Sequence, residues 1–425
     1  MTDMSTGLAR GTDETLSRPS NRLFRTFPAL AVRDYRLLIG STFLAINGWT
    51  MQQVVLGWYV LELTNSAFQL GLVLFFNLIP ILVLSIPGGV LADQMDKRIL
   101  MLVTQVSTFL IYSALALLVA IGQGHVWVVY IASFLTGLLL TLRLPAQQAI
   151  IVEIVGRQFL ANAVAISSAS FNATRIVGPA IAAGLVATTN VGISIFVIGL
   201  SYLAAGAATW ALSYRGTPAV SGGPSFAENL TEGMRYAKDD RRVLALLVLG
   251  ACHALLIMPF VAFVPAFARD VLNAGVEGLG VLNASVGVGA LVAAFLLAVY
   301  GHSMPNRGFM LFVATLIGGA SIAVFAVSTS YPLSIALMAV FGIVSITHMT
   351  LTNTLIQLIV PDRLRGRMMG FFLLIWGLMP IGTVLIGHAA ELIGVQAAVA
   401  AANVLGLILV IGIGASMAGS IRKID

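Results

Sequence analysis

The sequence consists of long apolar runs separated by short polar segments. The first run, Leu37 to Leu61, exceeds the roughly 20 residues that a helix needs to cross a bilayer. Only 9% of the 425 residues are charged and 59% are hydrophobic. Such a chain cannot cover a water-facing surface with polar groups, so soluble enzymes and disordered proteins are excluded. The continuous runs also exclude a membrane β-barrel, whose strands alternate.

We therefore expect an all-α integral membrane protein with twelve transmembrane helices. The predicted spans are residues 37–61, 68–92, 99–121, 126–142, 161–188, 191–213, 243–268, 277–300, 308–328, 332–358, 367–390 and 394–418. The predicted domains are an N-terminal tail (1–36), a first six-helix bundle (37–213), a central loop (214–242), a second six-helix bundle (243–418) and a C-terminal tail (419–425).

Basic residues predict the orientation. With the N-terminus in the cytoplasm, the inner segments 1–36, 93–98, 143–160, 214–242, 301–307, 359–367 and 419–425 contain 21 of the 23 Lys and Arg residues. Only Arg175 and Arg269 fall elsewhere. Because cytoplasmic loops are enriched in Lys and Arg, both termini are expected to be cytoplasmic in a multi-pass protein of the inner (plasma) membrane.

The two halves resemble a repeat. Leu70-Gly71 recurs as Leu279-Gly280 at an offset of 209, and residues 154–158 resemble residues 359–363 at an offset of 205. Both offsets are close to half the chain length. Two six-helix bundles in parallel repeat are typical of transporters whose binding site lies between the halves, near the bilayer midplane.

The loop after the second span carries a recognisable motif. Residues 88–98 read Gly-Gly-Val-Leu-Ala-Asp-Gln-Met-Asp-Lys-Arg. This resembles the loop signature of the major facilitator superfamily, Gly-x-Leu-Ala-Asp-Arg-x-Gly-Arg-Lys, although Gln94 and Asp96 depart from it. The alternative is an ordinary charged turn.

The resemblance implies a latch that holds the two halves in the outward-open state. It assigns this role to Asp93, and Arg143 at the inner end of the fourth span is the expected side-chain partner. Gly89 allows close helix approach, while Lys97 and Arg98 hold the loop on the cytoplasmic side.

The fifth span contains Arg175 and the pair Gly178-Pro179. The pair resembles the antiporter motif of exporters in the superfamily, and the alternative is a packing kink, because proline removes a backbone donor. An arginine at membrane depth is costly and needs a partner. Arg175 therefore either binds an anionic substrate or gates electrostatically, or it is structural and bonded to backbone carbonyls or to Asn172.

Several strings resemble one branch of the superfamily, which contains the enterobactin exporter and macrolide-efflux proteins. They are Arg143-Leu-Pro-Ala-Gln-Gln-Ala, Leu160-Ala-Asn-Ala and Arg175-Ile-Val-Gly-Pro, with further matches at residues 34–38, 51–58 and 365–368. The resemblance covers nearly the whole chain after about residue 25. It implies the major facilitator fold and export, and it fixes no substrate.

Neutral polar residues inside the spans are the candidates for a substrate cavity. They are Asn47, Trp49, Gln53, Asn77, Asn172, His253, Asn283, His348, Asn353 and Gln357. Each alone is also explained by a hydrogen bond between packed helices. As a set they predict a mostly apolar cavity, which suits amphipathic ligands.

The coupling ion is less clearly indicated. No carboxylate lies at the centre of a predicted span, so the candidates for a titrating group are His253, His348 and His388, because an unperturbed histidine changes charge near neutral pH. Proton antiport is implied by the family resemblance, and the residues equally allow facilitated diffusion.

We expect a secondary active transporter that exports a hydrophobic or amphipathic small molecule, of drug or siderophore type, by proton antiport with alternating access. The expected partners are this substrate, protons and membrane lipid, with no nucleic acid, and the protein is expected to be a monomer. No catalytic residue, metal site or cofactor is predicted, since nucleophile–base pairs, metal-ligand spacings and phosphate loops are absent. The alternatives are an importer or uniporter of a metabolite and a non-transporting membrane protein.

Overall fold

A computed structural model describes residues 26–214, 234–301, 304 and 306–421, and every regular element in these ranges is helical. Most of the predicted tails and central loop lies outside the described residues. The first half contains η1 (Pro28–Ala31), α2 (Arg33–Thr64), α3 (Ala67–Gln94), α4 (Lys97–Ala120), α5 (Val126–Thr188) and α6 (Val191–Trp210). The second half contains α8 (Arg241–Cys252), η2 (His253–Ile257), η3 (Met258–Phe263), α9 (Val264–Ala266), η4 (Phe267–Val271), α10 (Gly275–Tyr300), α11 (Arg307–Val327), α12 (Tyr331–Ile359), α13 (Asp362–Trp376), α14 (Met379–Ile393) and α15 (Val395–Ile421).

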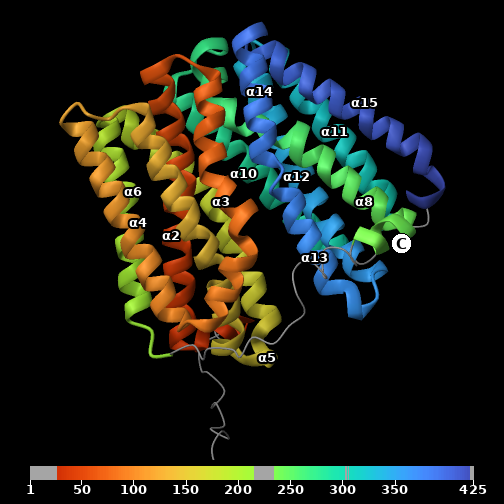
Figure 1. The fold of residues 1–425 in the computed structure, drawn as a ribbon, viewed down its shortest axis with the longest axis horizontal. Coiled ribbons are helices and arrows are strands. Elements are labelled where there is room, and N and C mark those ends of the chain that lie inside the picture. The colour runs from red at the N-terminus through yellow and green to blue at the C-terminus, as the bar shows by residue number, and fades with distance from the viewer. Residues whose placement is uncertain (1–25, 215–233, 302–303, 305, 422–425) are drawn as a thin grey trace, which may run out of the picture.

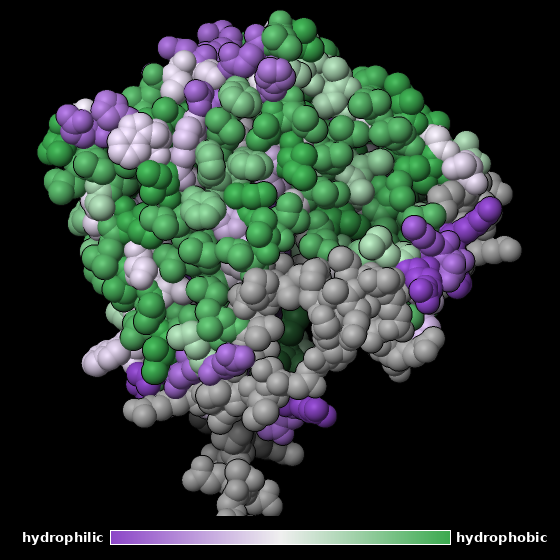
Figure 2. Space-filling view, in the orientation of Figure 1, coloured by the Kyte–Doolittle hydropathy of each residue, from purple (hydrophilic) through white to green (hydrophobic). Residues whose placement is uncertain are grey.

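The helices form two groups that follow the two halves of the sequence. In Figure 1, α2 to α6 lie together on the left, α8 and α11 to α15 lie on the right, and α10 lies between them. Within the described residues, nine helices are long and apolar enough to cross a membrane. Figure 2 shows apolar side chains over the middle of one face and hydrophilic ones toward its margins. This distribution is the one expected for a multi-pass membrane protein.

Three features separate the nine helices from the twelve predicted spans, and the first is that α2, the first predicted span, is not among the nine. Helix α5 is 63 residues long, and it breaks at Gly156, whose φ of 68° lies in the left-handed region. A straight helix of that length would extend about 95 Å, three times the thickness of the bilayer core. The segment predicted to connect the fourth and fifth spans is thus itself helical. The predicted eleventh span is divided into α13 and α14 by a turn at residues 377–378.

The same close contact between two helices occurs once in each half. Gly137 of α5 packs against the backbone carbonyl of Asn77 in α3, and Gly342 of α12 packs against that of Val286 in α10. A Cβ atom at either glycine would overlap with that oxygen. The two contacts are related by offsets of 205 and 209, the same offsets at which the sequence repeats.

The two halves also meet through related glycines. Gly71 of α3 lies against Thr383 of α14, where an added Cβ would be 2.6 Å from the carbonyl oxygen. Gly280 of α10 lies against Ala183 and the Pro179 carbonyl of α5. The Leu70-Gly71 and Leu279-Gly280 repeats therefore mark the surfaces through which the halves contact each other.

Candidate functional site

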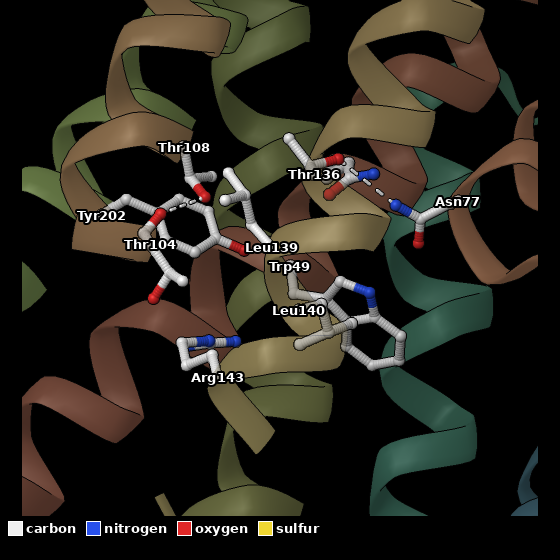
Figure 3. A pocket seen from close by; sticks show the side chains of 10 residues that line it. Trp49, Asn77, Thr104, Thr108, Thr136, Leu139, Leu140, Arg143 and Tyr202 are labelled. Carbon is white, nitrogen blue, oxygen red and sulfur yellow. Dashed lines mark hydrogen bonds between the residues drawn. The ribbon is translucent and has the colours of Figure 1, made fainter. Parts of the chain in front are cut away.

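A small polar pocket lies inside the first half, between five helices. Its lining residues are Trp49 and Gln52 of α2, Asn77 of α3, Thr104 and Thr108 of α4, Thr136, Leu139, Leu140 and Arg143 of α5, and Tyr202 of α6. Figure 3 shows the Arg143 side chain below the Tyr202 ring, with Trp49 across the pocket from both. The pocket thus combines one cation, two aromatic rings and several hydroxyl groups.

Arg143 is the only cation that lines this pocket in the described part of the chain. Its residue is 4% exposed, its guanidinium carbon lies 5.8 Å from the centre of the Tyr202 ring, and its Nη1 has no hydrogen-bond partner. The indole N–H of Trp49 is also buried without a partner. Buried donors without partners are rare in folded proteins. They leave this pocket able to bind an acceptor group or water.

Asn77 and the threonines hold the pocket in shape. Asn77 Nδ2 donates to the Ser133 carbonyl at 3.2 Å and to Thr136 Oγ1 at 3.4 Å, which joins α3 to α5. Thr108 Oγ1 donates to the Thr104 carbonyl at 2.7 Å, within α4. Asn77 therefore acts first as a bond between helices, and it faces the pocket from that position.

The loop-signature residues anchor the end of the first half that is predicted to face the cytoplasm. Lys97 is buried and its Nζ lies 2.8 Å from Glu153 Oε1, while Tyr214 donates to the other oxygen of Glu153 at 3.0 Å. Arg98 donates to the backbone carbonyls at the end of α6. Gly89 and Asp93 lie in α3, but their side chains lie outside the described ones, so the latch and the Asp93–Arg143 pair stay predictions.

Gly178 and Pro179 lie at a junction of three helices. A Cβ at Gly178 would overlap with Thr50 Oγ1 of α2, and the Pro179 carbonyl faces Gly280 of α10 from the other half. This motif therefore positions α5 against both neighbours. Arg175, one turn earlier, is partly exposed and forms no hydrogen bond or ion pair with a described residue, Asn172 included.

Most other predicted cavity residues bond to their own helix. The side-chain amides of Asn47, Asn172 and Asn283 donate to the carbonyls of Phe43, Ser168 and Leu279 at 3.0, 2.9 and 3.0 Å. Gln357 donates to Asn353, one turn away on α12, and Gln53 is partly exposed on α2. His253 and His348 are brought together by the fold of the second half. The residues predicted to line one cavity are thus distributed over several parts of the structure.

Hydrogen bonds between the halves gather at the ends of the helices that are predicted to face outside. Arg269 Nη1 donates to the Leu61 carbonyl at 2.9 Å. Glu391 of α14 accepts from the Ser66 hydroxyl and from the Phe68 N–H, the latter at 3.3 Å. Thr383 Oγ1 donates to the Gly71 carbonyl at 3.1 Å. These contacts close that end of the interface.

No motif in the sequence marks Tyr202, the threonines of α4, Glu153 or Glu391 as site residues. Nothing in the sequence indicates that α4 and α6 contribute to a site. Among the described residues, no cluster of three or more His, Cys, Asp or Glu side chains could hold a metal ion.

Comparison with known proteins gives the same picture over nearly the full length. The family model of transmembrane secretion effectors matches residues 25–424. Macrolide efflux protein A of Streptococcus pyogenes is 24% identical over 399 residues, which cover 93% of this chain and 98% of that protein. The enterobactin exporter EntS of Escherichia coli is 25% identical over 354 residues, which cover 82% of each chain.

The fold is similar to that of solved transporters. A bacterial homolog of the human lysosomal transporter Spinster, in an inward-facing and unoccupied conformation, superposes with a TM-score of 0.68. The match covers 95% of this chain and 97% of that one, at 14% sequence identity. The predicted resemblance to the major facilitator superfamily, and to the macrolide-efflux and enterobactin-exporter branch, is thereby confirmed. The chain belongs to the transmembrane secretion effectors, a family of membrane transporters rather than enzymes.

Proposed function

We propose that this protein is a secondary active exporter of a hydrophobic or amphipathic small molecule, of drug or siderophore type, driven by proton antiport. The observation that carries this proposal is the repeat-related pair of glycine contacts between the halves, Gly71 with Thr383 and Gly280 with Pro179. Small residues allow two bundles to pack closely and to move against each other as rigid bodies. The names of the relatives, a macrolide efflux protein and an enterobactin exporter, support export.

The proposal includes twelve spans with both termini in the cytoplasm of a plasma-membrane monomer. Helix α5 supplies two crossings because it breaks at Gly156. Helix α2 and the α13–α14 pair supply the two further crossings, at the predicted first and eleventh spans; α2 carries buried polar residues and α13–α14 is divided by a turn. In this topology, the hydrogen bonds of Glu391 and Arg269 lie on the outer side, and the structure represents the state that is closed there.

We propose that the polar pocket contacts one polar or anionic group of the cargo when it is bound between the halves. Arg143 Nη1 and the Trp49 indole N–H are the donors that lack partners. The apolar remainder of the cargo would lie against α2 and α5. An importer or uniporter is the alternative, and the direction of flux distinguishes it from an exporter.

The proposal is tested by flux in proteoliposomes under an imposed pH gradient. The probes are a lipophilic cation such as ethidium, a macrolide and a catecholate siderophore. We expect at least one probe to move in the direction opposite to the protons, and this movement to stop when the proton gradient is dissipated. The flux of that probe should fall in R143Q but not in G184A. The control is suitable because a Cβ at Gly184 meets no atom within 4 Å.

Two results would contradict the proposal. Probe movement that does not depend on the proton gradient would exclude antiport. Accumulation of the probe in the direction of the proton gradient would exclude export. Equal flux in R143Q and the wild type would remove the pocket from cargo binding.

A further inference from the structure

Two histidines stack face to face inside the second half. His253 begins η2 and His348 lies in α12, with ring centroids 4.2 Å apart and ring planes 16° apart. Phe341 is stacked on His253 at 6.3 Å. Phe341 and His348 are seven residues apart on α12, or about 10.5 Å along the helix axis. The His253 ring is thus stacked with two rings from the same helix, α12.

The hydrogen bonds leave ring nitrogens free. His348 Nδ1 lies 2.9 Å from Thr315 Oγ1 of α11, and Thr315 donates its only hydroxyl hydrogen to the Leu311 carbonyl at 2.8 Å. The Thr315 oxygen must then accept the Nδ1–H of His348, which fixes the tautomer and leaves a lone pair on Nε2. Both nitrogens of His253 are buried without a partner. The pair therefore holds unused lone pairs that can each bind a proton.

The pair is buried and has no described counter-charge. The two residues are 2% and 3% exposed. Apart from the thiol of Cys252, next to His253 in the chain, the other described titratable groups on the packed helices α8, α10, α11, α12, α14 and α15 lie in the first or last two turns of their helices. These groups are Arg241, Arg242, Glu277, Tyr300, Arg307, Tyr331, His388 and Glu391. The stacked rings are thus the titratable groups nearest the middle of this bundle in the described part of the chain.

The pair sits on the least regular span of the protein. Residues 241–271 change from α-helix to π-helix at His253, then to a 3-10 turn that contains Pro259, and return to π-helix after Pro265. Segments of π-helix often occur at functional sites, and proline removes backbone donors. A span of this kind can alter its course as the halves move, which would change what the His253 ring faces.

We infer that the His253–His348 pair is the site that binds the coupling proton, one proton for each pair. The inference rests on the proposed proton antiport. A lone pair on one ring nitrogen takes a proton from water on the outer side, forming an N–H bond, and that bond breaks when the proton passes to water on the inner side. Two charged rings at 4.2 Å would repel each other, so the pair holds one charge. The structure, closed at the predicted outer side, corresponds to the state after proton release.

The first test separates the pair from proton antiport itself. H253N, H348N and the wild type are assayed for ethidium exchange without a gradient and for ethidium flux driven by a pH gradient. We expect exchange to persist in both variants, and gradient-driven flux to fall about tenfold or more. The control H125N changes a histidine at the start of α5, far along the chain from the pair, and should behave as the wild type.

The outcomes are distinguishable. If the wild type shows no acceleration by the gradient, proton antiport is wrong. If the wild type and both variants accelerate equally, antiport stands and the histidine inference is overturned.

The second test reads protonation directly. The chain has five histidines, so their ¹⁵N signals in lipid nanodiscs are assignable with single variants. We expect one proton to bind to the pair as the pH falls, and H348N to change the titration of the His253 signal but not that of His125. Independent titration of the two rings, or no titration of either, would overturn the inference.

A milder variant covers the case in which the asparagine variants fail to fold. T315V keeps both rings and removes the acceptor of the His348 Nδ1–H. We expect it to change the ¹⁵N signals of His348 and to shift the pH at which gradient-driven flux falls by half. An unchanged pH profile together with unchanged His348 signals would overturn the inference.

Discussion

The two halves pack their helices in the same way but fill their interiors differently. In the first half, the first span is the unbroken 32-residue helix α2. In the second half, the corresponding segment is divided among five short elements between Arg241 and Val271. The shared glycine contacts at Gly137 and Gly342 show that close helix approach maintains the fold. The interior is therefore free to differ between the halves.

The first interior is polar and hydrogen-bonded. Ser41, Gln105 and Thr209 form a closed set of bonds between α2, α4 and α6, at 2.7, 2.9 and 2.9 Å. Each residue is fully buried. Because the donors and acceptors satisfy one another, this network fixes the positions of three helices.

The second interior is aromatic. Phe260 packs edge-on against Phe341 at 4.7 Å, and Phe267 contacts Phe325 at 4.8 Å. We expect aromatic contacts to permit more rearrangement than a closed hydrogen-bond network, so the first half should be the more rigid of the two.

The largest expected effect tests whether the shared contacts maintain both halves. G137A and G342A would each place a methyl group against a backbone oxygen, so each should lower the free energy of unfolding by about 3 kcal/mol. Thermal unfolding in detergent measures this, with G184A as the control. If only one variant is destabilised, the two contacts are not equivalent.

The next effect concerns the interface between the halves. G71A and G280A should each disfavour closure of the end that is predicted to face outside by about 1.4 kcal/mol, a tenfold change in the ratio of conformations. Electron–electron distance measurements between spin labels at Leu63 and Leu392, both exposed, follow this ratio, with G40A as the control. An unchanged distance distribution in both variants would show that these glycines do not control closure.

A smaller effect contrasts the two interiors through one pair of serines. S41A removes a hydroxyl with two partners and should cost about 1 kcal/mol, a usual value for a bond between membrane helices. S334A removes a buried hydroxyl without a partner, so it should be neutral or stabilising. The unfolding midpoints of the two variants measure this difference. Equal losses of stability in S41A and S334A would contradict the proposed difference between the two interiors.

The smallest effect is electrostatic and lies at the start of α8, where the second half begins. The pKa of Asp240 is lowered, chiefly because Arg242 donates hydrogen bonds to its carboxylate. A carboxylate whose pKa is lower in the folded state stabilises the fold at pH values above its unfolded-state pKa, near 4. This stability is lost as the pH falls through the folded-state pKa. The contribution should be about 0.5 kcal/mol, since the pair is near the surface. The stability difference between the wild type and D240N should therefore shrink in acid, and a constant difference would contradict this.

Several helices could be predicted closely from the sequence. The predicted spans 68–92, 191–213 and 277–300 correspond to Ala67–Gln94, Val191–Trp210 and Gly275–Tyr300. The predictions differed most where a helix continues past the membrane or divides within it, as at Gly156 and residues 377–378. Hydropathy shows how many consecutive apolar residues a segment contains. It does not show where a helix breaks or whether it continues beyond the membrane.

The candidate site was harder to predict. Trp49, Asn77 and Arg143 were predicted individually, in different roles, and the structure places them around one pocket with Tyr202, which no pattern indicated. The two histidines were predicted as separate candidates, and their stacking depends on the rotation of two helices that are 95 residues apart in the sequence.

The sequence by itself determined that the chain lies in a membrane, that its two halves repeat, and which superfamily it resembles. These properties are local, because apolar length and short motifs are read along the chain. The tertiary structure alone decided that Arg143 faces Tyr202, that His253 stacks on His348, and that the glycines of the repeat form the contact between the halves. Such pairings depend on how closely distant helices approach and how each is rotated, and the packing of all of them together sets both.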